Sequence, residues 1–497
     1  MNALQAASYE GNEVIVKLLL ENGADVNAEG GHYGNALQAA SGNEIIVRLL
    51  LENGANVNAE GGLYGNVLQA ASLKGNKAIV KLLLENEARV NAKGGHYGNA
   101  LQAASFKGNE VIVKLLLDNG AEVNAEGGWY GNALQAASSE GNEAIVNLLL
   151  EKGAKVNAEG GYYGNALQAA SFGDNEAIVN LLIKKGAEVN AEGGEYGSAL
   201  QAASFEGNEV IVKLLLKSGA DINVEGGEYG SALQAASFEG NETIVKLLLE
   251  NGAEVNAEGG EYGSALQAAS FEGNEAIVKL LLEKEAEMNA EGGEYGSALQ
   301  VASLRGNEVI VKLLLESGAV VNAEGGWYGN ALQAASYEGN EAIVELLLDN
   351  GVEVNAEGGY YGNALQAASL NNSKYNVVIV KLLLEYGAEA NAEGGYYGNA
   401  LQAASFAGNE AIVELLLESG ARVNAEGGYY GNALQAASFA GNEAIVKLLL
   451  ENGASVNAEG GHYGNALQAA SGNELIVRLL LEKGARGNAE GGQYGNL

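Results

Sequence analysis

The sequence predicts an all-α solenoid, in which about 15 short helix pairs stack side by side with short β-hairpin loops between them. Three observations predict this fold. A segment of about 33 residues recurs along all 497 residues, each copy holds two short segments with helix-capping residues, and Gly-Gly pairs separate the copies. One copy cannot bury its apolar face alone, so each copy must pack against its neighbours.

Gly-Gly pairs followed by x-Tyr-Gly mark where each repeat begins. Their spacing is 33 residues, except for two steps of 31 and one of 36. One repeat reads GGxYG[NS]ALQAASxxGNExIVxLLLExGAxVNAE, and its residues are numbered here as positions 1 to 33. We expect one continuous array over residues 1–497, with repeats at 2–29 (partial), 30–60, 61–93, 94–126, 127–159, 160–192, 193–225, 226–258, 259–291, 292–324, 325–357, 358–393, 394–426, 427–459, 460–490 and 491–497 (partial).

The elements of one repeat follow in order from its residues. The segment VNAE-GG-xYG predicts two extended arms and a tight turn, because the Gly-Gly pair allows the positive φ that such turns need. Asn or Ser at position 6 and Gln at position 9, such as Ser198 and Gln201, form a capping box that predicts the start of the first helix. Glycine at position 15, such as Gly207, predicts its end.

The second helix of each repeat has its own start and stop signals. Asn208 is expected to cap it, Glu209 complements its N-terminal dipole, and Gly219 closes it. Isoleucine, valine and leucine between these residues form the apolar stripe. Glu87 and Glu285 replace the closing glycine in two repeats, and each should cost up to about 1 kcal/mol if the left-handed geometry is kept.

Charge and composition exclude several classes of function. The chain has 27 Lys and Arg against 63 Asp and Glu, a net charge of -36. Such a chain repels phosphate backbones and anionic lipids, so we expect no nucleic-acid or membrane partner and favour a basic or neutral protein. No apolar run approaches the length of a membrane span, and the first residues carry no targeting signal, so we expect a cytoplasmic protein.

Catalytic residues are absent from the pattern. There is no cysteine, and the three histidines, His32, His96 and His462, lie in repeats too far apart to share a metal or a nucleophile. No Gly-Lys dipeptide occurs, which excludes the phosphate-binding loop of ATP- and GTP-binding proteins. We therefore expect a non-catalytic chain with no metal site and no small-molecule cofactor.

These repeats resemble ankyrin repeats over the whole chain. The family's T-P-L-H element is replaced by N-A-L-Q or S-A-L-Q, while its L-L, G-A and V-N-A elements stand intact at Leu148, Leu149, 153–154 and 156–158. The GGxYGNALQAAS variety resembles arrays carried by fungal NOD-like receptors. The resemblance implies a protein-interaction module or scaffold whose partner docks on the concave surface of hairpins and first helices. The alternative is a ligand-sensing or regulatory arm of a larger fungal NOD-like receptor ATPase.

Position 3, at the hairpin tip, differs most between the repeats. A turn-tip residue that can be Glu, Trp or His is not a core residue, and aromatic residues there suit partner recognition. We therefore predict partner contacts at this position by Trp129, Tyr162, Glu195, Glu228, Glu261, Glu294, Trp327, Tyr360, Tyr396 and Tyr429.

Position 13, near the end of the first helix, holds every phenylalanine of the chain. Two interpretations are open: the rings contact the partner, or they pack on the tyrosine at position 4. The candidates are Phe106, Phe172, Phe205, Phe238, Phe271, Phe406 and Phe439.

The four glutamate tips also allow two interpretations. With the glutamates that end the preceding repeats they form an acidic row that would steer a basic segment, or bind calcium or a polycation. The same repeats share serine at position 6, which instead indicates a block copied in tandem.

Three repeats and the two chain ends depart from the regular pattern. Residues 370–376 insert a polar bulge between two helices, and the two 31-residue repeats lack positions 13 and 14. Neither terminal repeat has a polar outer face, so we expect a piece of a longer polypeptide or open ends that stack on another chain. The oligomeric state stays open.

Overall fold

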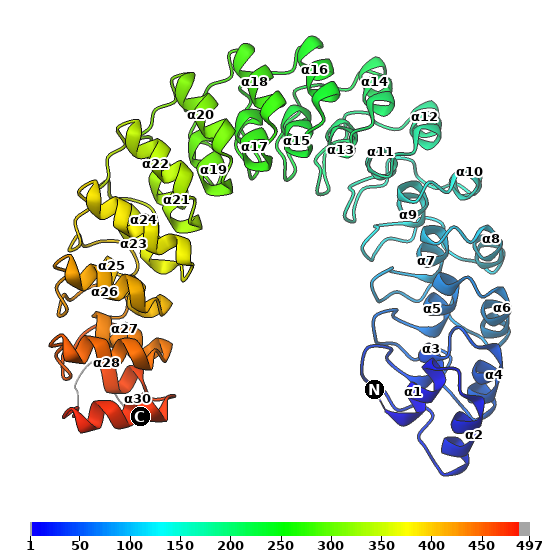
Figure 1. The fold of residues 1–497 in the computed structure, drawn as a ribbon. Helices are drawn as coiled ribbons and strands as arrows, with labels where there is room; N and C mark the ends of the chain where they lie inside the picture. The colour runs from blue at the N-terminus through cyan, green and yellow to red at the C-terminus, as the bar shows by residue number, and fades with distance from the viewer. Residues whose placement is uncertain (1, 487–497) are drawn as a thin grey trace. The chain divides into compact units, whose positions relative to one another are not determined.

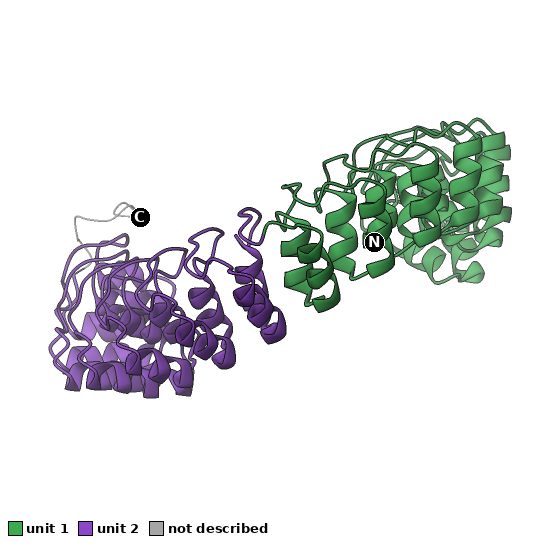
Figure 2. Cartoon of the chain, turned by 90° about the horizontal axis from the view of Figure 1, so that it is seen from above, with its two compact units in different colours: residues 1–254 green, residues 255–497 purple. Residues whose placement is uncertain are grey.

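The computed structural model describes residues 2–486, so the partial repeat 491–497 lies outside the described residues. Residues 2–486 form 30 α-helices in 15 consecutive pairs. The pairs divide into two compact units, Met1–Glu254 (unit 1) and Val255–Leu497 (unit 2), coloured separately in Figure 2. The prediction of an all-α solenoid with about 15 repeats is confirmed.

The first helix of each pair begins directly after position 6 of its repeat. These helices are α1 (Ala3–Tyr9), α3 (Ala36–Ala39), α5 (Val67–Lys74), α7 (Ala100–Phe106), α9 (Ala133–Ser139), α11 (Ala166–Phe172), α13 (Ala199–Glu206), α15 (Ala232–Glu239), α17 (Ala265–Glu272), α19 (Ala298–Arg305), α21 (Ala331–Glu338), α23 (Ala364–Leu370), α25 (Ala400–Ala407), α27 (Ala433–Ala440) and α29 (Ala466–Ala469).

The second helix of each pair carries the leucine-rich stripe. These helices are α2 (Glu13–Glu21), α4 (Glu44–Glu52), α6 (Lys77–Glu85), α8 (Glu110–Asp118), α10 (Glu143–Glu151), α12 (Glu176–Lys184), α14 (Glu209–Lys217), α16 (Glu242–Glu250), α18 (Glu275–Glu283), α20 (Glu308–Glu316), α22 (Glu341–Asp349), α24 (Lys374–Glu385), α26 (Glu410–Glu418), α28 (Glu443–Glu451) and α30 (Glu474–Glu482).

The predicted caps set the helix ends. Ser198 accepts a hydrogen bond from the backbone N–H of Gln201, and Asn208 accepts one from Ile211 at the start of the next helix. Gly207 adopts φ +84° and ends α13, as the sequence predicts. Glu87 and Glu285 keep the left-handed geometry, each with φ +63°. The expected side-chain cap is thus present at α13 and α14, whereas the Asn before the second helix makes no side-chain cap at α8, α10, α12, α16, α18, α20, α22 and α28.

The hairpin is shorter than the sequence predicts. Gly193 and Gly197 form an isolated antiparallel bridge, with a backbone N–H to O distance of 2.8 Å. The preceding segment is a turn and not an extended arm, because Asn190 bonds the next repeat. Its side-chain amide donates to the Gly219 oxygen at 3.1 Å, and its side-chain oxygen accepts from the backbone N–H of Asp221 at 2.8 Å.

Close contact between successive hairpins explains the second glycine of each pair. Gly194 has φ +66°, and a Cβ atom there would lie 2.3 Å from the carbonyl carbon of Tyr163 in the preceding repeat. Only glycine fits this position. The Gly-Gly pair thus allows the hairpins to stack backbone against backbone.

The core of each repeat lies between its two helices and those of the neighbouring repeats. The paired alanines of the first helices, such as Ala202 and Ala203, are fully buried, as are Val212 and Leu215 of α14. In unit 1, helices α5, α7 and α9 lie between the hairpin loops and the second helices (Figure 1). The small alanine side chains of the first helices allow neighbouring helices to pack closely.

Irregular repeats change helix length. The two 31-residue repeats have four-residue first helices, α3 and α29. In the 36-residue repeat, residues 374–376 extend α24 to 12 residues, so the predicted bulge is confined to 371–373. Asn376 is fully buried there, and its side-chain amide donates a hydrogen bond to the backbone oxygen of Ser336 at 3.0 Å.

Candidate partner-binding surface

The hairpin tips are joined to one another by main-chain hydrogen bonds. The N–H of Tyr360 donates to the oxygen of Trp327 at 3.0 Å, Tyr396 to Tyr360 at 3.0 Å, and Tyr429 to Tyr396 at 2.9 Å. Each tip therefore fixes the position of the next. None of the position 3 residues is buried in the described repeats, as the sequence predicts for tip residues.

In unit 2 the tip side chains stack into a column, called here the tip column. It comprises Trp327, Tyr360, Tyr396 and Tyr429, followed by His462. Ring centroids are separated by 5.0, 5.2, 4.9 and 4.7 Å, and the interplanar angles lie between 16° and 19°. Trp327 is 50% exposed, with Tyr360 stacked on one face. The tip column presents ring edges in a defined row.

Unit 1 has a shorter aromatic row on its tips. Trp129 lies between His96 and Tyr162, with centroid distances of 5.6 and 4.5 Å. Trp129 is 45% exposed. The glutamate tip Glu195 follows, and its N–H donates to the oxygen of Tyr162 at 2.9 Å. Within unit 1 the structure therefore brings aromatic and acidic tips into one continuous row.

The remaining glutamate tips occupy equivalent positions. Glu228 donates its N–H to the oxygen of Glu195 at 2.8 Å in unit 1, and Glu294 does the same to Glu261 at 3.0 Å in unit 2. The Glu261 carboxylate also accepts a bond from the hydroxyl of Tyr295 at 3.4 Å. In unit 2 the two glutamate tips therefore lie directly before the tip column in the row of hairpins.

The phenylalanines at position 13 lie against the tyrosines at position 4. Phe172 contacts Tyr163 of its own repeat at 5.2 Å and Tyr196 of the next at 4.8 Å between centroids. The same arrangement places Phe406 at 5.5 Å from Tyr397 and 5.0 Å from Tyr430. The contacts expected from packing are therefore present. Each ring keeps a partly exposed surface, at Phe106, Phe172, Phe205, Phe238, Phe271, Phe406 and Phe439.

Burial changes the acid–base properties of this surface. It raises the pKa of Tyr163 to about 12, with smaller contributions from Tyr162, Glu140 and Glu206. Burial also raises the pKa of Tyr397 to about 12. The pKa of Glu206 is raised by burial first, and then by the carboxylates of neighbouring residues. The surface therefore combines neutral phenols with partly desolvated carboxylates.

Gln at position 9 has a role that sequence analysis missed. The side-chain amide of Gln168 donates to the backbone oxygens of Ala191, Gly193 and Gly197 at 3.4, 2.9 and 2.8 Å. It thus holds the hairpin of the next repeat, in addition to its place at the start of its own helix. The available signal was the occurrence of Gln at this position in every complete repeat.

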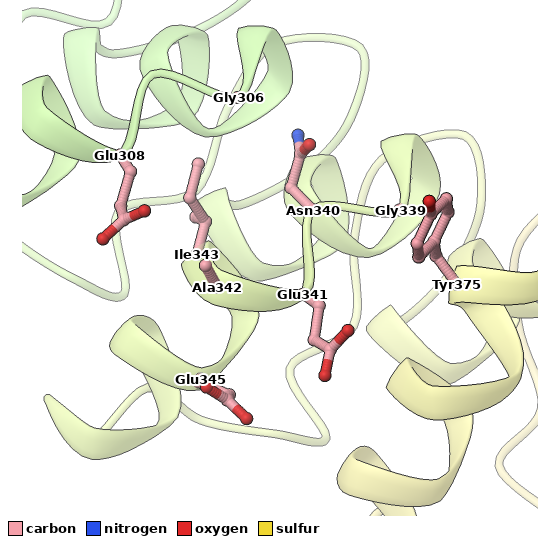
Figure 3. Close-up of a pocket in the computed structure, with 9 residues that line it drawn as sticks. All are labelled: Gly306, Glu308, Gly339, Asn340, Glu341, Ala342, Ile343, Glu345 and Tyr375. Atoms are coloured by element: carbon pink, nitrogen blue, oxygen red, sulfur yellow. The ribbon is translucent and has the colours of Figure 1, made fainter.

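A separate cavity of about 480 Å³ lies at the start of the second helices in unit 2. Glu308, Glu341, Glu345 and the exposed ring of Tyr375 line it, and Figure 3 shows these side chains. None of the predicted site residues lies there. Its carboxylates come from α20 and α22 and its tyrosine from α24. The residues that line it include no nucleophile paired with a base.

Within residues 2–486, no group of three or more His, Cys, Asp or Glu residues is placed to hold a metal ion. No helix in this range is long and apolar enough to cross a bilayer.

Stacked helix pairs that each contact their neighbouring pairs define a repeat solenoid. The chain belongs to the ankyrin repeat family, a family of protein-interaction modules that typically has no catalytic role. The family description "Ankyrin repeats (3 copies)" matches overlapping segments at residues 1–61, 37–127, 67–160, 126–193, 166–259, 200–292, 265–358, 332–427 and 426–490.

Among solved structures, the chain is similar to the human ASB11 ankyrin repeat domain. The identity is 27%, over 45% of this chain and 98% of that chain, with a TM-score of 0.38. No curated protein sequence matches the chain. The family match over residues 1–490 confirms the ankyrin resemblance, whereas the resemblance to NOD-like receptor arrays stays a prediction.

Proposed function

We propose that this chain is a non-catalytic scaffold of the cytoplasm that binds a protein or peptide through its hairpin tips and first-helix ends. The tip column of unit 2 carries this proposal. Four aromatic tips lie in one row, joined through both their backbones and their rings.

Preorganisation is the physical reason for assigning recognition to these rings. A side chain that is already held loses little conformational entropy when a partner docks on it. Tyr and Trp also supply large contact areas with polar groups at their edges. A stacked row of such rings therefore contributes binding energy that a flexible tip would lose on ordering.

Trp327 gives the sharpest test of this proposal. It is half exposed and has one stacked aromatic neighbour at its tip, so its removal disturbs the column least. Affinity capture from lysate of the source cells identifies bound proteins, and titration of each purified protein then gives its affinity. Trp327→Ala should weaken binding about 30-fold if this ring is an anchor residue.

Tyr375 provides the matched control. It is 53% exposed, but it lies at the cavity beside the second helices and not at a hairpin tip. Tyr375→Ala should leave affinity unchanged. Equal affinity for Trp327→Ala and the wild type, or a loss confined to Tyr375→Ala, would assign recognition to another surface.

The regulatory arm of a larger receptor remains the alternative from the sequence resemblance. It is tested by the size of the endogenous protein in source-cell lysate, using an antibody against these repeats. A band near 51 kDa, the mass of this chain, favours the scaffold. A much larger band favours the receptor arm.

A further inference from the structure

A cation of the chain already occupies the aromatic surface of unit 2. The guanidinium carbon of Arg305 lies 4.5 Å from the ring centroid of Phe271, over the ring face. Its Nε donates to the backbone oxygen of Phe271 at 3.1 Å, and its terminal nitrogen lies 4.0 Å from the Glu272 carboxylate. Position 14 of one repeat therefore meets the position 13 ring of the preceding repeat.

Lys74 repeats this relationship in unit 1. Its ammonium nitrogen lies 6.0 Å from the ring centroid of Tyr9. The intervening repeat lacks positions 13 and 14, so Tyr9 is the preceding position 13 residue. Burial at this contact lowers the pKa of Lys74. Two independent contacts thus show that a cation at position 14 seats on a position 13 ring.

Further along unit 1, position 14 holds a glutamate in place of a cation. Glu206 stands to Phe172 as Arg305 stands to Phe271, 34 residues further on. The Glu206 charge raises the pKa of both Tyr163 and Tyr196, the two tyrosines that contact Phe172. Glu206 is therefore close enough to both of these tyrosines to act on them electrostatically.

No compensating cation reaches the Glu206 carboxylate. Among residues 2–486, no ion pair involves it. Its charged neighbours are Glu239 and Asp174, which repel it and add to the pKa increase caused by burial. A partly desolvated anion with anionic neighbours is stabilised when a cation binds.

We propose that unit 1 binds an extended, arginine-rich segment of a protein partner, with one guanidinium seated on Phe172 beside Glu206. This inference rests on the proposed function, that the first-helix ends are a partner surface, and it names the chemistry of the partner. The guanidinium takes the place on Phe172 that Arg305 occupies on Phe271. Arginine suits this place because its planar, weakly hydrated cation both stacks on a ring and pairs with a carboxylate.

Ring spacing also specifies the pattern of the partner. The centroids of Phe172 and Phe205 are 6.4 Å apart, and those of Phe205 and Phe238 are 6.5 Å apart. Alternate residues of an extended chain lie about 6.7 Å apart, at about 3.3 to 3.4 Å per residue. A segment with arginine at every second position therefore matches successive rings.

The test titrates three synthetic peptides into the full chain by calorimetry. They are Arg-Ser-Arg-Ser-Arg-Ser-Arg, its lysine counterpart, and a peptide with four arginines separated by two serines each. All carry the same charge. The alternating arginine peptide should bind about fivefold or more tightly than either of the others. Equal affinities, or no binding of any peptide, would overturn the proposal.

Variants locate the site. Glu206→Gln should weaken the alternating arginine peptide about tenfold, whereas Glu151→Gln, on an exposed helix end of the same unit, should not. Glu206→Arg supplies the cation from the chain itself and should block the site while the circular dichroism spectrum stays that of the wild type. Equal effects of Glu206→Gln and Glu151→Gln would reduce the interaction to general charge attraction and overturn the proposal.

A gain of binding gives a readout that misfolding cannot imitate. Arg305→Ala removes the internal cation from Phe271 and from the Glu272 carboxylate, and it leaves Glu338, which lines the same pocket as Phe271. It should raise the number of arginine peptides bound per chain. An unchanged stoichiometry would show that Phe271 does not accept an external guanidinium and would count against the geometry.

Failure of this inference is distinguishable from failure of the proposed function. If captured partners depend on Trp327 while the peptides fail to bind, the scaffold proposal stands and the arginine proposal falls. If the arginine peptide binds with the expected dependence on Glu206 while captured partners ignore Trp327, the unit 1 site stands and the tip column loses its assigned role.

Discussion

The side chain of Gln168 holds the hairpin of the next repeat through Gly197, whose backbone oxygen accepts its amide N–H at 2.8 Å. Gln168 is almost fully buried, so this bond is protected from water. This buried bond adds to the main-chain bonds between hairpin tips and to the exposed bonds of residues such as Asn190, which also join successive repeats. The stability of the array therefore depends in part on buried polar bonds between successive repeats.

Gln168→Ala should lower the free energy of unfolding by about 2 to 3 kcal/mol, because it removes three hydrogen bonds from a buried side chain to the backbone, at about 0.5 to 1.5 kcal/mol each. Urea denaturation followed by circular dichroism measures this loss. The exposed Lys184→Ala is the control and should change stability by less than about 0.5 kcal/mol. A similarly small effect of Gln168→Ala would show that water replaces the lost donor.

Gly194→Ala should be among the most destabilising single changes in unit 1. The new Cβ would lie 2.3 Å from the carbonyl carbon of Tyr163, so the backbone must shift, at a cost of about 3 kcal/mol or more. Gly186→Ala is the matched control, with φ +88° but nothing within 4 Å. It should cost only about 1 kcal/mol. Equal losses in thermal unfolding would argue against tight hairpin stacking.

Asn190→Ala removes the bonds to the Gly219 oxygen and the Asp221 N–H. Both partners are exposed or half-buried, so water partly replaces the bonds, and the expected loss is about 1 kcal/mol. Hydrogen exchange should quicken at the Asp221 amide in particular. Asn147→Ala, whose amide bonds only within its own helix, should leave that amide unchanged.

Tyr396→Ala should destabilise unit 2 more than Trp327→Ala does. Tyr396 stacks between Tyr360 and Tyr429, whereas Trp327 has one stacked neighbour. An aromatic pair contributes about 0.5 to 1.5 kcal/mol beyond its buried area, so the difference should be about 1 kcal/mol. Thermal unfolding of the two variants measures it, and the reverse order would show that the tip column contributes little to folding.

The raised pKa of Glu206 predicts a pH-dependent stability. The protonated carboxyl contributes stability that is fully present below the unfolded pKa and is lost as pH rises through the higher folded pKa. Glu206→Gln should therefore be more stable than the wild type at neutral pH, and this advantage should shrink as pH falls toward the unfolded pKa. Unfolding free energies measured across the acidic range test this, with Glu151→Gln, at an exposed position, as the matched control.

Much of the fold could be predicted because the signals act locally. Asn or Ser before Ala-Leu-Gln caps a helix whatever surrounds it, and glycine at position 15 ends that helix by its own conformational freedom, as at Gly207. The extended hairpin arms were predicted wrongly because the deciding bonds of Asn190 reach residues 29 and 31 positions away. No local propensity reports such bonds.

By itself, the sequence determined the repeat period, the helix pairs, the exposed tips and the acidic character of this protein. Those properties follow from residue spacing, capping and charge, which need no knowledge of neighbouring repeats. Only the tertiary structure decided that the tip rings stack, that Gln168 reaches across a repeat boundary, and that the Arg305 guanidinium lies over the ring of Phe271. Each of these is a contact between residues about one repeat apart, and its geometry exists only once the repeats have packed.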